Sequence, residues 1–163
     1  MTYLLDSNVL MTAARLHYAF DLAPGFWDWV GAQHRAGNLH SIPKVKDEIT
    51  AGTDQLAVWA EALPAAFWGP VSPTKITSAR LVARWVYDPQ HAYSQAAREE
   101  FLNVADSMLV AEAHASGLTV VSGENPAPEA VKRVNLPDAC RALAVPYENP
   151  YEVYRRLGLR LIV

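Results

Sequence analysis

Hydrophobic and polar residues follow one another along the chain in two rhythms, one typical of short buried strands and one typical of helices. An apolar run of strand length, TYLL, ends at Asp6, and the next stretch, SNVLMTAARL, carries apolar residues at helical spacing. The same kinds of segment return near residue 119, where LTVVS follows an alanine-rich helical stretch. Strands separated by helices predict an α/β fold in which helices flank a parallel sheet on both faces.

Proline and glycine mark further elements. Proline at the first helical position and glycine after the last turn predict helices in PGFWDWVGAQHRAG and PKVKDEITAG. A helical middle of unusual length runs from about Leu63 to Phe101, with a break near YDPQ. LPDACRALAV and PYEVYRRLG indicate short helices, and the other candidate strands are LHSIP and, at the end of the chain, LRLIV.

Composition and charge limit the class of protein. With 163 residues, 51% of them hydrophobic, we expect a single domain over 1–163 that buries its own core. The single cysteine, Cys140, cannot form an intramolecular disulfide, and the chain shows neither an export signal nor a membrane span, so we expect a cytoplasmic protein. A net charge of -3 argues against a surface that coats polyanions in general. Any contact with nucleic acid must therefore be local.

One acidic residue occupies a position where the helical pattern asks for an apolar one. In NVADSMLVAEAHASG, Asp106 shares its face with Leu102, Leu109 and Val110. A bare carboxylate in such surroundings is costly unless something pairs with it. Neither Lys nor Arg occurs between 103 and 121, so the sequence favours a metal ion as the partner.

Three more acids fall on other elements where they can meet Asp106. Asp6 follows the first strand and Glu124 follows LTVV, and ligands bind outside the carboxyl ends of parallel strands. Glu48 lies on the apolar side of its short helix, whereas Asp47 points the other way. These four acids, from four separate elements, predict one acidic site at the edge of the sheet.

Simpler interpretations exist for three of these acids when each is taken singly. Asp6 could cap the helix that begins at Ser7, Glu48 could be a solvated helix residue, and Glu124 could be an ordinary turn acid. Taken together they suit a hard cation such as Mg²⁺ or Mn²⁺, which prefers oxygen ligands. The five histidines are scattered and give no zinc spacing, and the nucleotide-binding glycine loops and the serine hydrolase elbow have no counterpart here.

The ordered set of acidic motifs resembles the PIN-domain nucleases. The resemblance rests on LLDSNVL, PKVKDEI, NVADSMLVAEA and LTVVSGE, which cover most of the chain in order and spacing. It implies a PIN-like fold and a metal-dependent ribonuclease in which the catalytic, metal-binding acids are Asp6, Glu48, Asp106 and Glu124. By the same likeness, Asn8 and Ser122 would hydrogen-bond these acids and orient them. The ending PYEVYRRLGLRLIV is similar to a toxin-like branch of the family.

The resemblance also implies partners: an RNA substrate, and an antitoxin protein if the chain is the toxin of a toxin-antitoxin pair. Cations near the acidic elements would hold the RNA, first Lys44 and Lys46, with further candidates in Arg80, Arg84, Lys132 and Arg133. The five tryptophans indicate core or interface positions, from which a homodimer is a fair hypothesis.

Two other functions stay open at this point. A phosphatase could use Asp6 as nucleophile, although that chemistry usually takes a second acid two residues on, where this chain has Asn8. A non-catalytic binding module could dock a basic partner in the acidic pocket. Metal-dependent cleavage of RNA would separate the nuclease from both alternatives.

Overall fold

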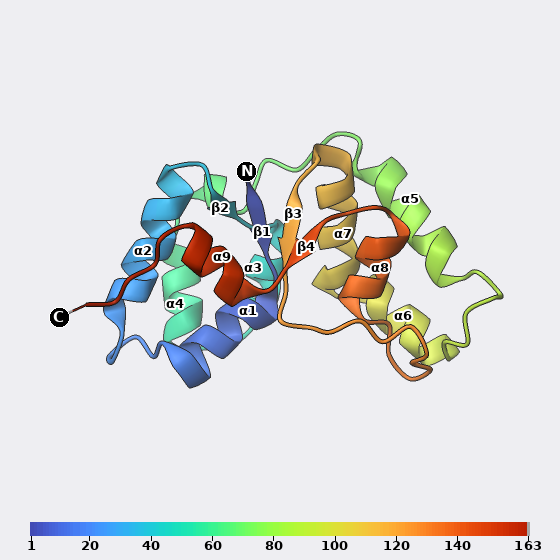
Figure 1. The fold of residues 1–163 in the computed structure, drawn as a ribbon, viewed down its shortest axis with the longest axis horizontal. Coiled ribbons are helices and arrows are strands. Elements are labelled where there is room, and N and C mark those ends of the chain that lie inside the picture. Colours follow the sequence, from blue (N-terminus) through green and yellow to red (C-terminus); the bar gives the residue numbers. More distant parts are fainter. Residues whose placement is uncertain (163) are drawn as a thin grey trace.

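The sheet has four parallel strands. The structure is a computed structural model and describes residues 1–162. In it the strands have the spatial order β2-β1-β3-β4 (Figure 1). Their bounds are β1 Tyr3–Leu5, β2 Leu39–His40, β3 Thr119–Val121 and β4 Tyr147–Glu148. The central strands β1 and β3 pair in parallel with Tyr3 opposite Thr119, which confirms the sequence-based α/β prediction.

Helices flank the sheet on both faces. In Figure 1, α2, α4 and α9 lie to the left of β1, α3 lies behind it, and α5 to α8 lie to the right of β3. The helices are α1 Ser7–Thr12, the π-helix η1 Ala13–His17, α2 Pro24–Arg35, α3 Pro43–Thr50, α4 Gln55–Ala62, the 3₁₀-helix η2 Ala65–Phe67, α5 Lys75–Val86, α6 Gln95–Asn103, α7 Ala105–Ser116, α8 Leu136–Ala142 and α9 Pro150–Arg156. The predicted helical middle corresponds to η2, α5 and α6.

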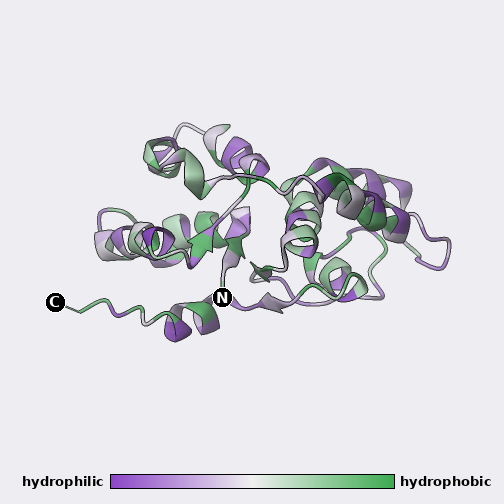
Figure 2. Cartoon of the chain, turned by 90° about the horizontal axis from the view of Figure 1, so that it is seen from above, coloured by the Kyte–Doolittle hydropathy of each residue, from purple (hydrophilic) through white to green (hydrophobic). Residues whose placement is uncertain are grey.

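The core lies between the sheet and these helices. Every residue of β1 and β3 is buried, and α7 packs beside β3 with Leu109 and Val110 fully enclosed. Figure 2 shows hydrophobic residues on the strands and on the inner sides of the helices, with hydrophilic residues outward. Trp27 and Trp68 are buried, and the other three tryptophans, Trp29, Trp59 and Trp85, pack partly buried against the same core.

One predicted strand and one predicted helix start are wrong. Residues 159–162 of LRLIV form no strand, because α9 ends in a left-handed turn at Gly158 (φ 75°) and the chain then turns toward Gly25 of α2. The edge position is taken by β4, which is two residues long and therefore has no alternation to reveal it. The helix that carries Asp106 begins at Ala105, so Leu102 belongs to α6 and not to the same helical face.

A membrane-spanning helix needs both length and apolar composition. Among residues 1–162, no helix combines the two.

Candidate functional site

The topology brings the four predicted acids to one edge of the sheet. Asp6 follows the last residue of β1, and Glu124 follows β3 by three positions. α7 leads into β3 through a left-handed turn at Gly117 (φ 67°) and packs against it, so the start of α7 lies at the edge where β3 ends. Asp106 is the second residue of this helix, and Glu48 of α3 reaches the same place.

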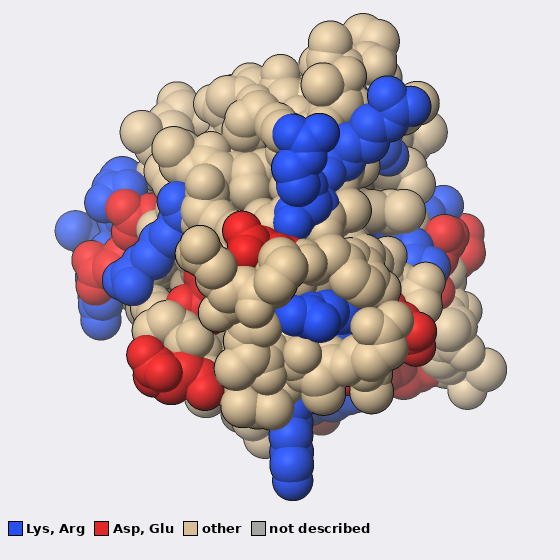
Figure 3. All heavy atoms as spheres, turned by 90° about the vertical axis from the view of Figure 1, so that its right-hand side faces the viewer, with Lys and Arg blue, Asp and Glu red and all other residues tan. Residues whose placement is uncertain are grey.

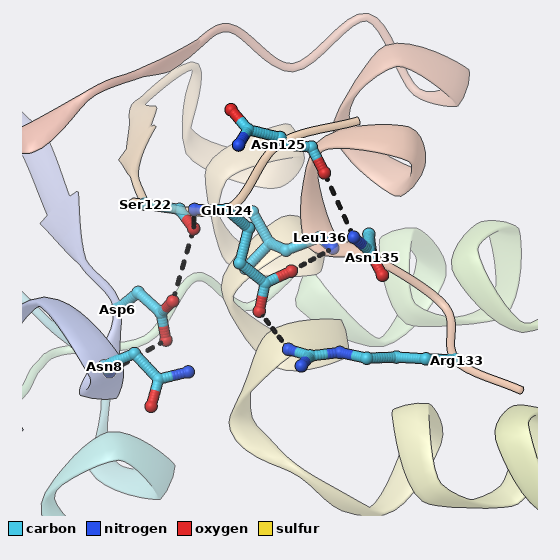
Figure 4. A network of polar contacts seen from close by, with 8 residues as sticks. All are labelled: Asp6, Asn8, Ser122, Glu124, Asn125, Arg133, Asn135 and Leu136. Carbon is cyan, nitrogen blue, oxygen red and sulfur yellow. Dashed lines mark hydrogen bonds and ion pairs between the residues drawn. The ribbon is translucent and has the colours of Figure 1, made fainter. Parts of the chain in front are cut away.

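Asp6 lies at the bottom of the site. Its side chain is fully buried and caps α1, accepting a hydrogen bond from the backbone N–H of Asn8 at 3.4 Å. Ser122 Oγ donates to the other carboxylate oxygen, also at 3.4 Å (Figure 4). Burial, followed by the negative charge of Glu124, raises the pKa of Asp6 to about 7, although these two hydrogen bonds oppose the rise. Asp6 therefore does cap α1, as the simpler interpretation holds. The cap does not remove the repulsion between Asp6 and the neighbouring carboxylates.

Asp106 has no partner in the part of the chain that the structure describes. Its carboxylate forms no hydrogen bond or ion pair with any of residues 1–162, and the side chain is half-buried. Burial is the largest cause that raises its pKa, to about 8, and the charge of Asp6 is the next. The pair of Asp6 and Asp106 therefore keeps a proton near neutral pH when no cation is present.

Glu48, by contrast, is satisfied by the protein. One carboxylate oxygen accepts from Ser7 Oγ at 2.6 Å, and the other accepts from the backbone N–H of Ala105 at 2.7 Å. These contacts join the start of α1, α3 and the start of α7. Glu48 thereby fixes the end of the helix from which Asp106 projects.

Glu124 is satisfied too. Its carboxylate pairs with the guanidinium of Arg133 and accepts from the backbone N–H of Leu136 at 3.0 Å, at the start of α8. Its own N–H donates to Ser122 Oγ at 3.1 Å. In Figure 4 its carboxylate is turned toward Arg133, away from Asp6.

The chemistry of these donors decides which cation fits. Within residues 1–162 no three His, Cys, Asp or Glu side chains are arranged as a group that could hold a metal ion, because the oxygens of Glu48 and Glu124 are turned to protein donors. Mg²⁺ is commonly bound by only one or two carboxylates, with water and substrate phosphate completing its shell. Asp6 and Asp106 suit such a site. Direct ligation by Glu48 and Glu124 stays a prediction.

Two cavities open beside the acids, with volumes of about 370 and 380 Å³. The first lies between α1, η1 and α9, and Glu124 is at its wall. The second is lined by Glu48 and Asp106 together with residues of α6. Asn8 and Arg133 line both cavities, and Figure 4 shows the Asn8 amide extending into the space between Asp6 and Arg133.

Other predicted residues lie elsewhere or act differently. Asn8 contacts Asp6 through its backbone N–H and not through its side chain. Lys44 and Lys46 line neither cavity at the acids, and Lys46 pairs with Glu61 of α4 at 3.5 Å. Arg133 is the cation that the structure places there. The sequence offers it only as one of six candidates, since nothing in VKRVN distinguishes it from its neighbour Lys132.

A sequence-family model described as "Domain of unknown function (DUF4411)" matches residues 3–161, nearly the whole chain. The chain belongs to this family. Comparison of the chain with the curated proteins and with the solved structures found no match.

The DUF4411 chain also carries a buried thiol beside the acids. Burial, then the negative charges of Asp106, Asp6 and Glu124, raises the pKa of Cys140 to about 12. A thiol in that state is a poor nucleophile at neutral pH. The carboxylates and Arg133 are therefore the groups available for chemistry.

Proposed function

We propose that this protein is a Mg²⁺- or Mn²⁺-dependent ribonuclease of the PIN type. The observation that carries the proposal is the pair Asp6 and Asp106, brought together from β1 and α7 at the carboxyl edge of a parallel sheet, with raised pKa values and no ion pair between Asp106 and any of residues 1–162. A divalent cation that replaces the shared proton would relieve the repulsion between them.

Asp6 and Asp106 would hold the cation. When bound, it would neutralise phosphate charge and lower the pKa of a water that attacks the phosphodiester. Ser122 and the N–H of Asn8 orient Asp6, and Glu48 fixes the start of α7. Arg133 offers a positive charge to the phosphate from between the two cavities.

The test is cleavage of a mixed panel of single-stranded RNAs by the purified chain, with Mg²⁺ or Mn²⁺ and with EDTA. We expect cleavage only with metal, and its loss in Asp6→Asn and in Asp106→Asn. Asp47→Asn is the matched control, because Asp47 is an exposed carboxylate next to Glu48. Absence of cleavage with either metal, or cleavage that survives both substitutions, would contradict the proposal.

The phosphatase alternative finds less support. That chemistry usually takes a second acid two residues after the nucleophile, and this chain has Asn8 at that position. A binding module that docks a basic partner would use the same acids without turnover. The cleavage assay separates that alternative from the nuclease.

The partners of such a toxin-like nuclease are part of the same proposal. An antitoxin would have to cover the edge where the acids lie. The tryptophans pack within the chain, so they supply no argument for a homodimer. Light scattering would decide whether a dimer forms.

A further inference from the structure

The cavity between α1, η1 and α9 has an aromatic wall. Four rings line it: His17 and Tyr18 at the end of η1, and Tyr151 and Tyr154 on α9. A π-helix such as η1 is rare and is often found at functional sites. The rings come from two elements 130 residues apart in sequence, so the cavity is a product of the fold.

The rings differ in how firmly they are held. Tyr18 stacks on Phe26 with centroids 4.3 Å apart, and Tyr154 is buried to 6% exposure, so both are fixed by the core. Tyr151 is 38% exposed, and His17 stands edge-on to it at 5.9 Å. Tyr151 and His17 therefore offer ring surface to a ligand while Tyr18 and Tyr154 support them.

Polar groups complete the wall. Asn149 Oδ1 accepts from the N–H of Tyr151 at 2.9 Å, which orients its amide, and the amide NH₂ group has no partner among residues 1–162. Thr12 and Asn8 add a hydroxyl and a second amide. Aromatic faces combined with a few amide and hydroxyl groups are what a protein uses to stack an unpaired base and to read its edge.

The cavity adjoins the acidic site. Asn8 and Arg133 line this cavity and also the one that holds Asp106, and Glu124 lies on its wall. A strand whose phosphate lies near Arg133 can therefore direct a neighbouring base into the aromatic cavity. The volume of about 370 Å³ is in the range of small-ligand pockets and leaves room for a single base.

We propose that this cavity binds one unpaired base of the RNA, adjacent to the phosphate at the acids. The inference rests on the proposed function, because it assumes that RNA is the ligand of the acidic site. It narrows the substrate to RNA in which that base is single-stranded or extruded. Tyr151 is the central stacking residue.

The experiment measures binding in the Asp106→Asn background, in which RNA is not cleaved. Fluorescence anisotropy compares the binding of a short single-stranded RNA with that of a series of abasic RNAs. Each abasic RNA has the same sequence but lacks the base at one position. We expect Tyr151→Ala to weaken binding of the intact RNA about 10-fold, the order of one lost base stack. Tyr151→Phe should bind as before, because it keeps the ring.

The set of abasic RNAs locates the base. At one position, the missing base should weaken binding by the Asp106→Asn protein. On that abasic RNA, the additional substitution Tyr151→Ala should have no further effect. Tyr87→Ala is the matched control, since Tyr87 is a similarly exposed tyrosine outside the cavity. His17→Ala provides a second variant, and thermal melts verify that each variant is folded.

The outcomes separate the inference from the proposed function. If the wild-type chain cleaves RNA and Tyr151→Ala has no effect on binding, the nuclease proposal stands and the base pocket is overturned. Equal loss on every abasic RNA, or equally tight binding of the same RNA after it is annealed to its complement, also overturns it. If binding of an unpaired base depends on Tyr151 but the wild-type chain does not cleave RNA, the base pocket stands and the nuclease proposal is overturned.

Discussion

The four acids of the site divide into two pairs by what surrounds each carboxylate. Glu48 and Glu124 accept hydrogen bonds on both oxygens, so their charges are compensated by the protein. Asp6 and Asp106 share a buried region: burial and the charge of Glu124 raise the pKa of Asp6, and burial and the charge of Asp6 raise the pKa of Asp106. Substitutions in the two pairs should therefore change stability in opposite directions.

Asp106→Asn should stabilise the metal-free protein at neutral pH and abolish metal-dependent cleavage. The raised pKa of Asp106, about 8 against 3.8, means that the folded state takes up a proton where the unfolded state does not. The wild type should therefore lose stability as pH rises from about 4 to about 8, whereas the variant should lose only the part that the raised pKa of Asp6 causes. At pH 8 in EDTA, we expect the Tm of Asp106→Asn to be about 2–4 °C higher than that of the wild type, which corresponds to about 1 kcal/mol.

Metal should reverse this order. Added Mg²⁺ should raise the Tm of the wild type by mass action and that of Asp106→Asn little. Asp47→Asn serves as the control, with the metal response of the wild type. An Asp106→Asn protein that is less stable than wild type in EDTA would mean that Asp106 has a partner within the protein and would argue against the metal site.

Ser122→Ala should lower activity without changing the ligand set. Ser122 Oγ donates to the Asp6 carboxylate and accepts from the backbone N–H of Glu124, so it fixes Asp6 against the turn that follows β3. Removing a group that orients metal-binding residues typically costs about 10–100-fold in activity or metal affinity. Steady-state cleavage rates test this. Ser116→Ala, at the far end of α7, is the control, and equal rates in both variants would make Ser122 a structural residue only.

The placement of α7 depends on the contacts at its first turn. Glu48 accepts from the N–H of Ala105 and from Ser7 Oγ, so one carboxylate joins α3 to the starts of α7 and α1. Helix starts leave backbone N–H groups unpaired, and an acid there also interacts favourably with the helix dipole. Glu48 is thus a structural contact between elements, whether or not it also reaches a metal.

Glu48→Ala should therefore destabilise the metal-free protein. Hydrogen bonds to charged groups contribute about 1.5–3 kcal/mol, so we expect a loss near 2 kcal/mol, measured by urea unfolding in EDTA. Relief of repulsion acts against this loss, but Glu48 is among the smaller causes of the raised pKa of Asp6 and Asp106. Asp47→Ala should change stability little. A Glu48→Ala protein more stable than wild type would show that repulsion outweighs the hydrogen bonds.

Sequence patterns predict the elements that carry a strong periodic signal. The strands 3–5 and 119–121 and the capped helix α2 were predictable because buried runs and terminal proline or glycine are local features. β4 was not, since two residues carry no alternation. The hydrogen-bond partners of Glu48 and Glu124 were not predictable from the sequence either. Ala105 and Leu136 donate through their backbone N–H groups, which every residue but proline has.

Charge over the whole molecule is consistent with local binding of RNA. The net charge is -3, and on the face in Figure 3 the basic side chains lie in separate groups among acidic and uncharged ones. Arg133, exposed on the loop between β3 and α8, lines both cavities at the acids. Binding that relies on so few cations should depend only weakly on salt.

Arg133→Gln should lower that salt dependence further. Each phosphate contact on a single strand contributes about -0.7 to the slope of log K against log salt, so losing Arg133 should reduce the slope by about 0.7. The measurement is anisotropy of a labelled single-stranded RNA between about 50 and 200 mM salt. Arg80→Gln, on exposed α5 outside both cavities, should keep the wild-type slope. Because Arg133 also pairs with Glu124, a melt must first show that the variant is folded. If the folded variant keeps the full slope, Arg133 binds only Glu124, and the phosphate must lie at another cation.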